Sequence, residues 1–270
     1  MTTITMPAAA VAARTYNIDP AGEPDTARPA VQQSGPHAEL HPQRLARLTG
    51  LLFLVTFATS IPPVATYYVP ALSDPAFVLG GGFDARISLG ALLELILIAA
   101  NIGTALTLYP VLRRRFPVLS LGYVTARLTE CGFIAVGIVA LMALNTLRLH
   151  AGDGDPQTLV AVGQALVAIH DWTFRLGPGV VVGVGNGLIL GVMMWETRLV
   201  PRAMSILGLV GGPALLAAGV AVLFGTIEAG SLPQLVATIP EFFWELSLGL
   251  WLLLRGFNSP AVAALAVPRG

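Results

Sequence analysis

Lysine is missing from this chain of 270 residues, and charge of either sign is scarce. Fifteen basic residues, all arginine, balance fifteen acidic ones, so the formal net charge is zero at pH 7. Without a basic surplus the chain cannot hold a phosphate backbone, which excludes nucleic acid as a partner. Charged residues make up only 11% of the chain and apolar residues 55%. This composition lies outside the soluble globular range and predicts an integral membrane protein.

Cysteine occurs once, so the chain cannot form an internal disulfide. Cys131 lies inside an apolar run, where a buried structural thiol explains it better than a reactive one. The first 43 residues lack the basic start and apolar core of a cleaved signal peptide, and they are rich in Pro, Ala, Gln and acidic residues. We predict a disordered cytoplasmic tail over residues 1–43 and a short cytoplasmic tail over residues 257–270.

Long apolar runs fill the middle of the chain, and each is long enough to cross a bilayer, which takes about 20 residues. The runs are 46–68, 87–109, 119–147, 176–195, 203–226 and 235–254. The short loops between them make neighbouring helices antiparallel. The sequence therefore predicts an all-α fold, a bundle of six transmembrane helices over residues 44–256.

Arginine is distributed unevenly between the two sides of this bundle. One side holds Arg44, Arg47, Arg113, Arg114, Arg115, Arg198, Arg202 and Arg255, and the other holds only Arg86, Arg148 and Arg175. Because basic loops stay inside, we expect both termini in the cytoplasm. Residues 157–175 have a helical apolar period but are too short to span, and Pro178 follows. We predict an interfacial helix before the fourth span, and the upper part of a long, broken fourth span is the alternative.

Ionisable side chains interrupt the apolar runs at positions where lipid-facing helices should carry none. They are Glu94, Arg127, Glu130, Glu241 and Glu245. At roughly 2.5 to 3.5 kcal/mol per central charge, five isolated charges would cost more than about 12 kcal/mol, which exceeds most folding free energies. These groups must therefore pair, protonate, bind a cation or meet water.

Helical spacing groups these residues with further polar ones. Glu94 shares a face with Asn101, and His170, Asp171 and Arg175 lie above the same layer. The predicted binding or relay site is Glu94, Asn101, Arg127, Glu130, His170, Asp171, Arg175, Glu241 and Glu245. One arginine neutralises at most two carboxylates, so we hypothesise that the acidic surplus is the functional part. The alternative is structural, with an Arg-x-x-Glu lock between helices and a helix-end cap at His170 and Asp171.

Catalytic and metal-binding patterns are poorly represented. No HExxH spacing occurs, all four histidines lie outside the apolar runs, and Asn186 stands where an intramembrane protease would need aspartate. We predict no metal site and no cofactor, and the sequence favours a protein that is not an enzyme.

Glycine recurs every fourth residue in the fourth run, at Gly179, Gly183, Gly187 and Gly191. This spacing bares one flank of the helix, so a neighbouring helix can approach closely. We predict a helix-packing face, used within the chain or between subunits of a homo-oligomer.

Several stretches resemble the bacterial multi-span family catalogued as domain of unknown function 4386. They are LGALLELILIAANIGTALTLYPVLRR (89–114), LGYVTARLTECGFIAVGI (121–138), HDWTFRLGPG (170–179) and PEFFWELSLGLWLL (240–253). The resemblance covers roughly residues 40–258 and implies a six-span inner-membrane protein. Its recurrent polar positions correspond here to Glu94, Arg127, Glu130, His170, Asp171, Glu241 and Glu245.

Three functions fit these observations. The first is a permease or channel-like protein for a small solute or a cation, in which the acidic layer binds the solute or relays protons. The second is a membrane scaffold or sensor whose polar layer only joins helices. A membrane-embedded hydrolase is third. Besides the lipid bilayer, the expected partners are the small solute or cation and a second copy of the chain.

Overall fold

The computed structural model describes residues 41–266, and every regular element in that range is helical. Six helices are long and apolar enough to cross a membrane. They are α1 with η1 (Pro42–Tyr67), α3 (Ala85–Leu112), α4 (Pro117–Leu149), the continuous helix Pro156–Thr197, α7 (Arg202–Leu223) and α8 (Leu232–Leu254). The predicted all-α bundle of six spans is confirmed. The tail predicted at 1–43 lies outside the described residues except for its last three positions.

Local sequence signals set the ends of these helices. Proline occupies the first turn of α1, α4 and α8, where its missing N–H costs no hydrogen bond. Asp84 caps α3 by accepting a hydrogen bond from the backbone N–H of Arg86 at 2.9 Å. The Arg86 guanidinium also donates to this carboxylate, which holds the pKa of Asp84 below its ordinary value. Asp155 caps the fourth span in the same way, at 2.8 Å from the Thr158 N–H.

The fourth span differs from the predicted arrangement. In place of a separate interfacial helix, one helix of 42 residues runs from Pro156 to Thr197, so the long-span alternative is the observed one. Its parts are α5 (Pro156–Leu176), the π-helical η4 (Gly177–Val181) and η5 (Gly183–Leu190), and α6 (Gly191–Thr197). Pro178, which was expected to break the helix, lies in η4. Because π-helical turns widen the hydrogen-bond ladder, they accommodate a residue without an N–H, and the helix continues.

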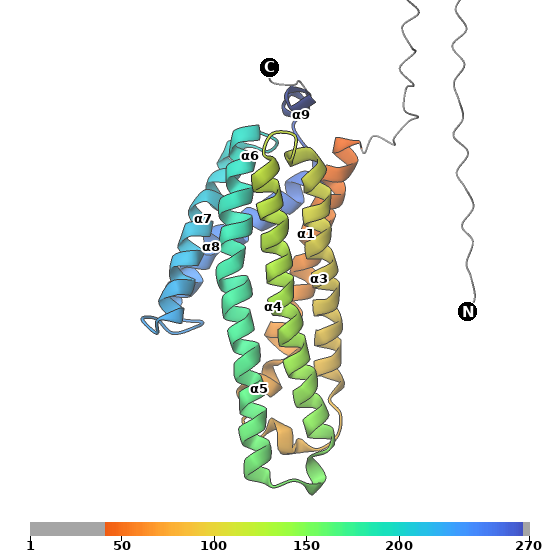
Figure 1. Ribbon diagram of the computed structural model, residues 1–270, viewed down its shortest axis with the longest axis vertical. Helices are drawn as coiled ribbons and strands as arrows, with labels where there is room; N and C mark the ends of the chain where they lie inside the picture. Colours follow the sequence, from red (N-terminus) through yellow and green to blue (C-terminus); the bar gives the residue numbers. More distant parts are fainter. Residues whose placement is uncertain (1–40, 267–270) are drawn as a thin grey trace, which may run out of the picture. The chain divides into compact units, whose positions relative to one another are not determined.

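The helices lie lengthwise beside one another in one bundle (Figure 1), and their contacts form a closed ring of neighbours. The segment α1 packs against α3 and α8, α3 packs against α4, α4 packs against α5 and η5, and α7 packs against η5 and α8. Consecutive spans run antiparallel, as predicted from the short connections. The first and last spans are therefore neighbours, and the interior of the ring is lined by every span.

The glycine face of the fourth span lies against α7. A Cβ on Gly183 would come within 2.7 Å of the Gly212 carbonyl oxygen, and a Cβ on Gly187 would overlap the Cα of Gly212. A Cβ on Gly191 would meet Leu209 at 3.4 Å, and Gly179 places its carbonyl against Gly219. The face through which a homo-oligomer was expected is thus covered by a helix of the same chain.

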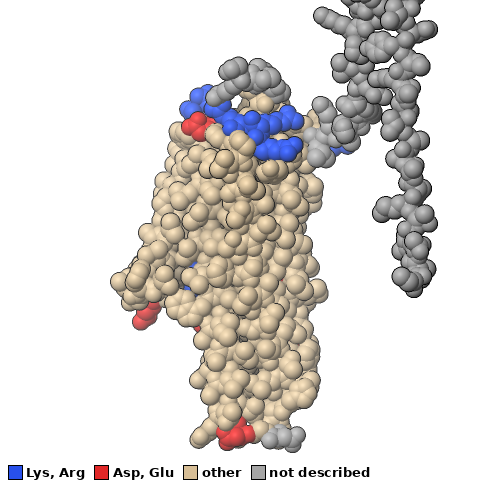
Figure 2. Space-filling model, viewed as in Figure 1, with Lys and Arg blue, Asp and Glu red and all other residues tan. Residues whose placement is uncertain are grey.

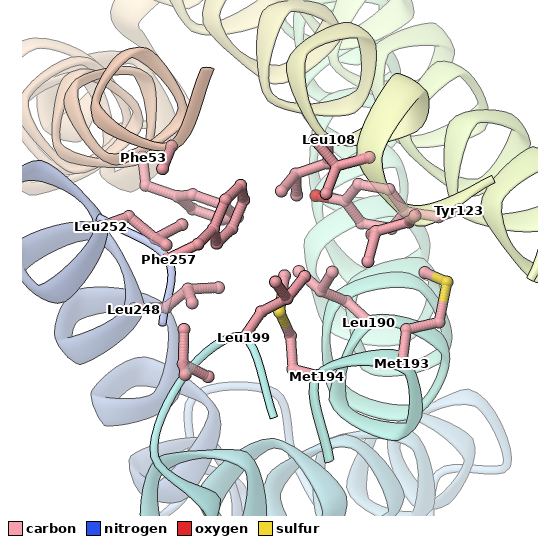
Figure 3. Close-up of a cluster of buried hydrophobic side chains, with 14 of the residues drawn as sticks. Phe53, Leu108, Tyr123, Leu190, Met193, Met194, Leu199, Leu248, Leu252 and Phe257 are labelled. Carbon is pink, nitrogen blue, oxygen red and sulfur yellow. The ribbon is translucent and has the colours of Figure 1, made fainter. Parts of the chain in front are cut away.

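A hydrophobic core closes the bundle at one end (Figure 3). Side chains from α1, α3, α4, η5, α6 and α8 meet there, among them Phe53, Leu108, Tyr123, Leu190, Met193, Met194, Leu248 and Leu252. Phe257 joins this core although it lies in the predicted tail, and it is followed by the short helix α9 (Ser259–Ala266). The Gln43 side chain donates to the Phe257 carbonyl at 2.8 Å and accepts from its N–H at 3.0 Å.

Basic side chains gather at this same closed end, near α6 and α9 (Figure 2). The visible middle of the bundle is almost free of charge, and acidic side chains are seen both beside the basic group and toward the other end. The end of the bundle where the basic side chains gather is called the arginine end.

Candidate functional site

A cavity of about 420 Å³ lies in the ring, away from the closed core. It is bounded by residues of α1, η1, α3, α4, α5, η4, α7 and α8. Six of the nine polar residues predicted from the sequence line it, namely Glu94, Asn101, Arg127, Glu130, Glu241 and Glu245. They come from α3, α4 and α8, so the structure brings together residues separated by up to 151 positions (245 − 94). We call this feature the acidic cavity.

Arg127 is the centre of a closed polar ring on one wall. Its Nη1 donates to Glu130 Oε2 at 2.8 Å, one turn away on α4. Its Nη2 donates to Asn101 Oδ1 on α3 at 2.5 Å. Asn101 completes the ring by donating from Nδ2 to Glu130 Oε1 at 3.1 Å. These two hydrogen bonds and the ion pair commit the arginine to a single carboxylate and fasten α3 to α4.

Glu94 is held by a tyrosine from outside its helix. Tyr68, which follows η1, donates its hydroxyl hydrogen to Glu94 Oε2 at 2.8 Å. Burial raises the pKa of Tyr68, and the neighbouring Glu94 raises it further, so the phenol remains a donor. The His170 ring packs edge-on against the Tyr68 ring, with centroids 5.5 Å apart. His170 therefore contacts the tyrosine of this pair, and it is not among the residues that line the cavity.

Glu245 is bound by Asn186 of η5. The Asn186 Nδ2 donates to Glu245 Oε1, and the Asn186 backbone carbonyl accepts from Trp244 Nε1 at 2.9 Å. Asn186 and Trp244 are both fully buried. The side chains of two consecutive residues on α8 are thus fixed by one residue of the π-helical segment.

Glu241 stands apart from the other carboxylates. Its residue is 2% exposed, yet neither carboxylate oxygen has a hydrogen-bond partner among the described residues. Gly187 and Gly211 make room for the carboxylate, because a Cβ on either residue would lie within 3 Å of Oε2. Buried polar groups are nearly always paired, so this carboxylate lacks a partner that a proton, a water or a ligand would have to supply.

Asp171 and Arg175 do not reach the cavity. They pair with each other at 3.5 Å on α5, where both are partly exposed, and Arg175 also stacks over Trp172 at 5.1 Å. Asp171 Oδ1 lies 3.8 Å from His170 Nδ1. The nine predicted residues therefore divide into six at the cavity, one behind it and two at the surface.

Charge around the cavity is unbalanced. The described residues that line it include four carboxylates and one guanidinium, and the guanidinium is committed to Glu130. The rest of the lining is mostly apolar, with aromatic rings at Phe57, Phe174 and Phe242. Across residues 41–266, no group of three or more His, Cys, Asp or Glu side chains has the arrangement of a metal site. The site can accept protons or hydrogen bonds, and can hold positive charge against an apolar wall.

Comparison with known proteins bears on the whole bundle. The sequence profile described as Domain of unknown function (DUF4386) matches residues 48–256, which include every residue of the cavity wall. The chain belongs to this family. Searches of the curated proteins and of the solved structures gave no match. The DUF4386 match confirms the predicted family, and it carries no activity with it.

Two site residues of this DUF4386 protein escaped the sequence-based prediction. Tyr68 was not among the predicted residues, and Asn186 was considered only at the position where an intramembrane protease would need aspartate. Asn186 did carry a usable signal, because an amide among glycines in an apolar span needs a polar partner. Tyr68 carried none, since its contact with Glu94 depends on how the chain folds back after η1.

Proposed function

We propose that this protein is a multi-pass protein of the bacterial cytoplasmic membrane that binds a small polar or cationic solute in the acidic cavity, as a permease or channel-like protein. The observation that carries the proposal is Glu241, a buried carboxylate on the cavity wall with no partner among the described residues. An unpaired buried charge is costly, so a site that retains one gains most from a ligand that neutralises it.

The individual residues have different roles in this proposal. Glu241 and Glu245 lie four residues apart on one face of α8 and form the binding pair, since two like charges favour a cation or a shared proton between them. Glu94 is the next carboxylate toward the end of the bundle that lies away from the arginine end. It relays a proton or lines the path of the solute. Arg127 and Glu130 are positioning residues that hold α3 and α4 in place.

The orientation is part of the same proposal. The arginine end, where the sequence-derived inner boundary falls, would face the cytoplasm, so both termini would lie inside. The acidic cavity lies on the other side of the closed core and would then be reached from outside.

A scaffold or sensor is the second candidate, and one observation favours it. The ring of Arg127, Glu130 and Asn101 is complete, and such a closed set can serve only to fasten helices. The ring does not account for Glu241, whose oxygens a purely structural protein would be expected to pair.

Thiol access separates the two candidates. In a Cys131→Ala background, cysteine replaces Glu94, Glu130 or Glu241, and a cationic membrane-impermeant methanethiosulfonate is added outside intact cells. We expect modification at positions 94 and 241. Ser73→Cys, at the exposed last residue of helix α2 (Val69–Ser73), is the positive control, and Ser205→Cys, fully buried in α7, is the negative control. Modification at Ser73→Cys with none at position 241 would reject a solute pathway from outside.

A further inference from the structure

The acidic cavity opens sideways between helices. Three of its lining residues are large, apolar and strongly exposed: Ile61 of α1 at 49%, Phe174 of α5 at 45% and Phe242 of α8 at 41%. A residue that both lines a cavity and is exposed marks its opening, so we call these three residues the apolar mouth. The helix packing agrees, because α8 packs on α1 and α7, whereas α5 packs mainly on α4.

The apolar mouth reaches into the lipid on its Phe242 side. Phe242 lies 12 residues (254 − 242) from Leu254 at the arginine end of α8, which is about 18 Å along the helix axis. The hydrocarbon layer is about 30 Å thick, so Phe242 faces acyl chains and not the aqueous phase. A ligand bound in the acidic cavity can therefore direct an apolar chain toward the bilayer on this side, whichever way its head enters.

The floor of the cavity requires the opposite chemistry. Glu241 has unpartnered oxygens, Glu245 accepts only from Asn186, and the Arg127 guanidinium is committed to Glu130 and Asn101. Phe57 lines the cavity next to the apolar mouth, and its ring is in edge-to-face contact with that of Phe242 at 5.2 Å. Aromatic faces attract organic cations, and carboxylates neutralise them.

The volume limits the size of the ligand. About 420 Å³ is near the lower end of the range for small-molecule sites, roughly 300 to 1,000 Å³. A single short chain with a compact head fits such a space, whereas a two-chain phospholipid does not. Anionic heads are excluded by the acidic floor.

From these features we infer that the ligand of the acidic cavity is an amphipathic organic cation, with an amine or quaternary ammonium head at Glu241 and Glu245 and a short apolar chain toward the apolar mouth. This inference rests on the proposed function and narrows the solute to one chemical class.

A chain-length series tests it on the full protein in lipid nanodiscs. Binding of tetramethylammonium, butyltrimethylammonium and hexyltrimethylammonium is measured by calorimetry, with empty nanodiscs subtracted and hexanoate as the anionic control. We expect affinity to rise about fourfold for each methylene that enters the apolar wall, and hexanoate not to bind. Glu241→Gln should weaken the binding of every cation by at least tenfold, since it removes the charge and keeps the shape.

A matched pair of variants tests the wall. Phe242→Asn should reduce the dependence of affinity on chain length, while Phe243→Asn should not. Phe243 is also exposed, at 52% against 41% for Phe242, but it does not line the cavity. Equal affinity for all three cations, dependent on Glu241, would overturn this inference and leave the proposed function standing. Binding of none of them, or binding unaffected by Glu241→Gln, would reject cation binding in the cavity, and with it this inference and the cationic form of the proposed function.

Discussion

Arg127 on α4 donates to Asn101 on α3 at 2.5 Å, and the same guanidinium pairs with Glu130 at 2.8 Å. All three residues are buried, with Arg127 3% exposed. A guanidinium in this position is stable only because each partner is in place, so the ring joins two helices and neutralises one carboxylate at once.

Replacing the arginine alone should therefore lower the free energy of unfolding more than replacing both members of the ion pair. We expect Arg127→Met to lower the free energy of unfolding by about 3–5 kcal/mol, because Glu130 then remains as an uncompensated buried charge. The double variant Arg127→Met/Glu130→Leu should be less destabilised than the sum of the two single variants. Unfolding in mixed micelles measures all three, and simple additivity would contradict the closed ring.

The contact between the fourth span and α7 gives a graded series. Gly187→Ala should destabilise by about 1–3 kcal/mol, because its new methyl group overlaps the Gly212 backbone, which cannot move aside. Gly191→Ala, with its nearest neighbour at 3.4 Å, should have a smaller effect. Gly132→Ala is the control, since nothing lies within 4 Å of the added carbon, and it should be neutral or stabilising. Thermal unfolding checks the order, and equal effects at all three positions would refute it.

Tyr68→Phe should destabilise the protein by about 1–3 kcal/mol, because the buried Glu94 loses its hydrogen-bond donor. Tyr67→Phe is the matched control, as the neighbouring ring is only half-buried. Replacing both partners, Tyr68→Phe with Glu94→Leu, should recover most of the loss, since no polar group is then left unpaired. A double variant as unstable as Tyr68→Phe alone would speak against the pair. Thermal unfolding provides the measurement.

The cap at Asp155 should make the start of α5 sensitive to acid. The backbone hydrogen bond from Thr158, followed by that of its side chain, lowers the pKa of Asp155 from 3.8. A lowered pKa means that the ionised cap stabilises the helix start above pH 4 or so, and that this contribution is lost as pH falls through the folded value. Hydrogen exchange of residues 156–160 should therefore accelerate, after correction for its intrinsic pH dependence, on acidification. In Asp155→Asn this change should be absent, and an equal response in both proteins would disprove it.

The proposed orientation predicts the behaviour of fused reporters. A fluorescent protein joined after Gly270 should fluoresce, and alkaline phosphatase at the same place should stay inactive, because the arginine end would remain in the cytoplasm. Alkaline phosphatase inserted after Ser73 should be active. The reverse pattern of reporter activity would show that the bundle has the opposite orientation, with the acidic cavity toward the cytoplasm.

Much of this molecule could be predicted from its sequence because the bilayer constrains it so strongly. Six apolar runs are read directly as six spans, since backbone groups in lipid must satisfy one another within a helix. The same constraint made Glu94, Asn101, Glu241 and Glu245 conspicuous, because polar residues are rare at that depth. The pairing of Arg127 with Glu130 followed from their helical spacing.

The remainder depends on contacts between distant segments. Spacing alone did not predict that Pro178 would be accommodated in a widened turn, so the fourth span was divided in two. His170 was expected at the site on grounds of depth, but its ring packs against Tyr68, and Asp171 and Arg175 pair with each other in partly exposed positions. Phe257 was assigned to a tail because it follows the last apolar run, whereas its side chain fills a gap in the closed core.

The double hydrogen bond between Gln43 and Phe257 joins the start of the first span to the residue that follows the last one. Because α1 and α8 also pack side by side, the spans form a closed circle of neighbours. The chain is interrupted in this circle only between its first and its last span. A circularly permuted gene, opened at an exposed connection on the same side of the membrane and closed by a short linker between these two residues, should still encode the bundle.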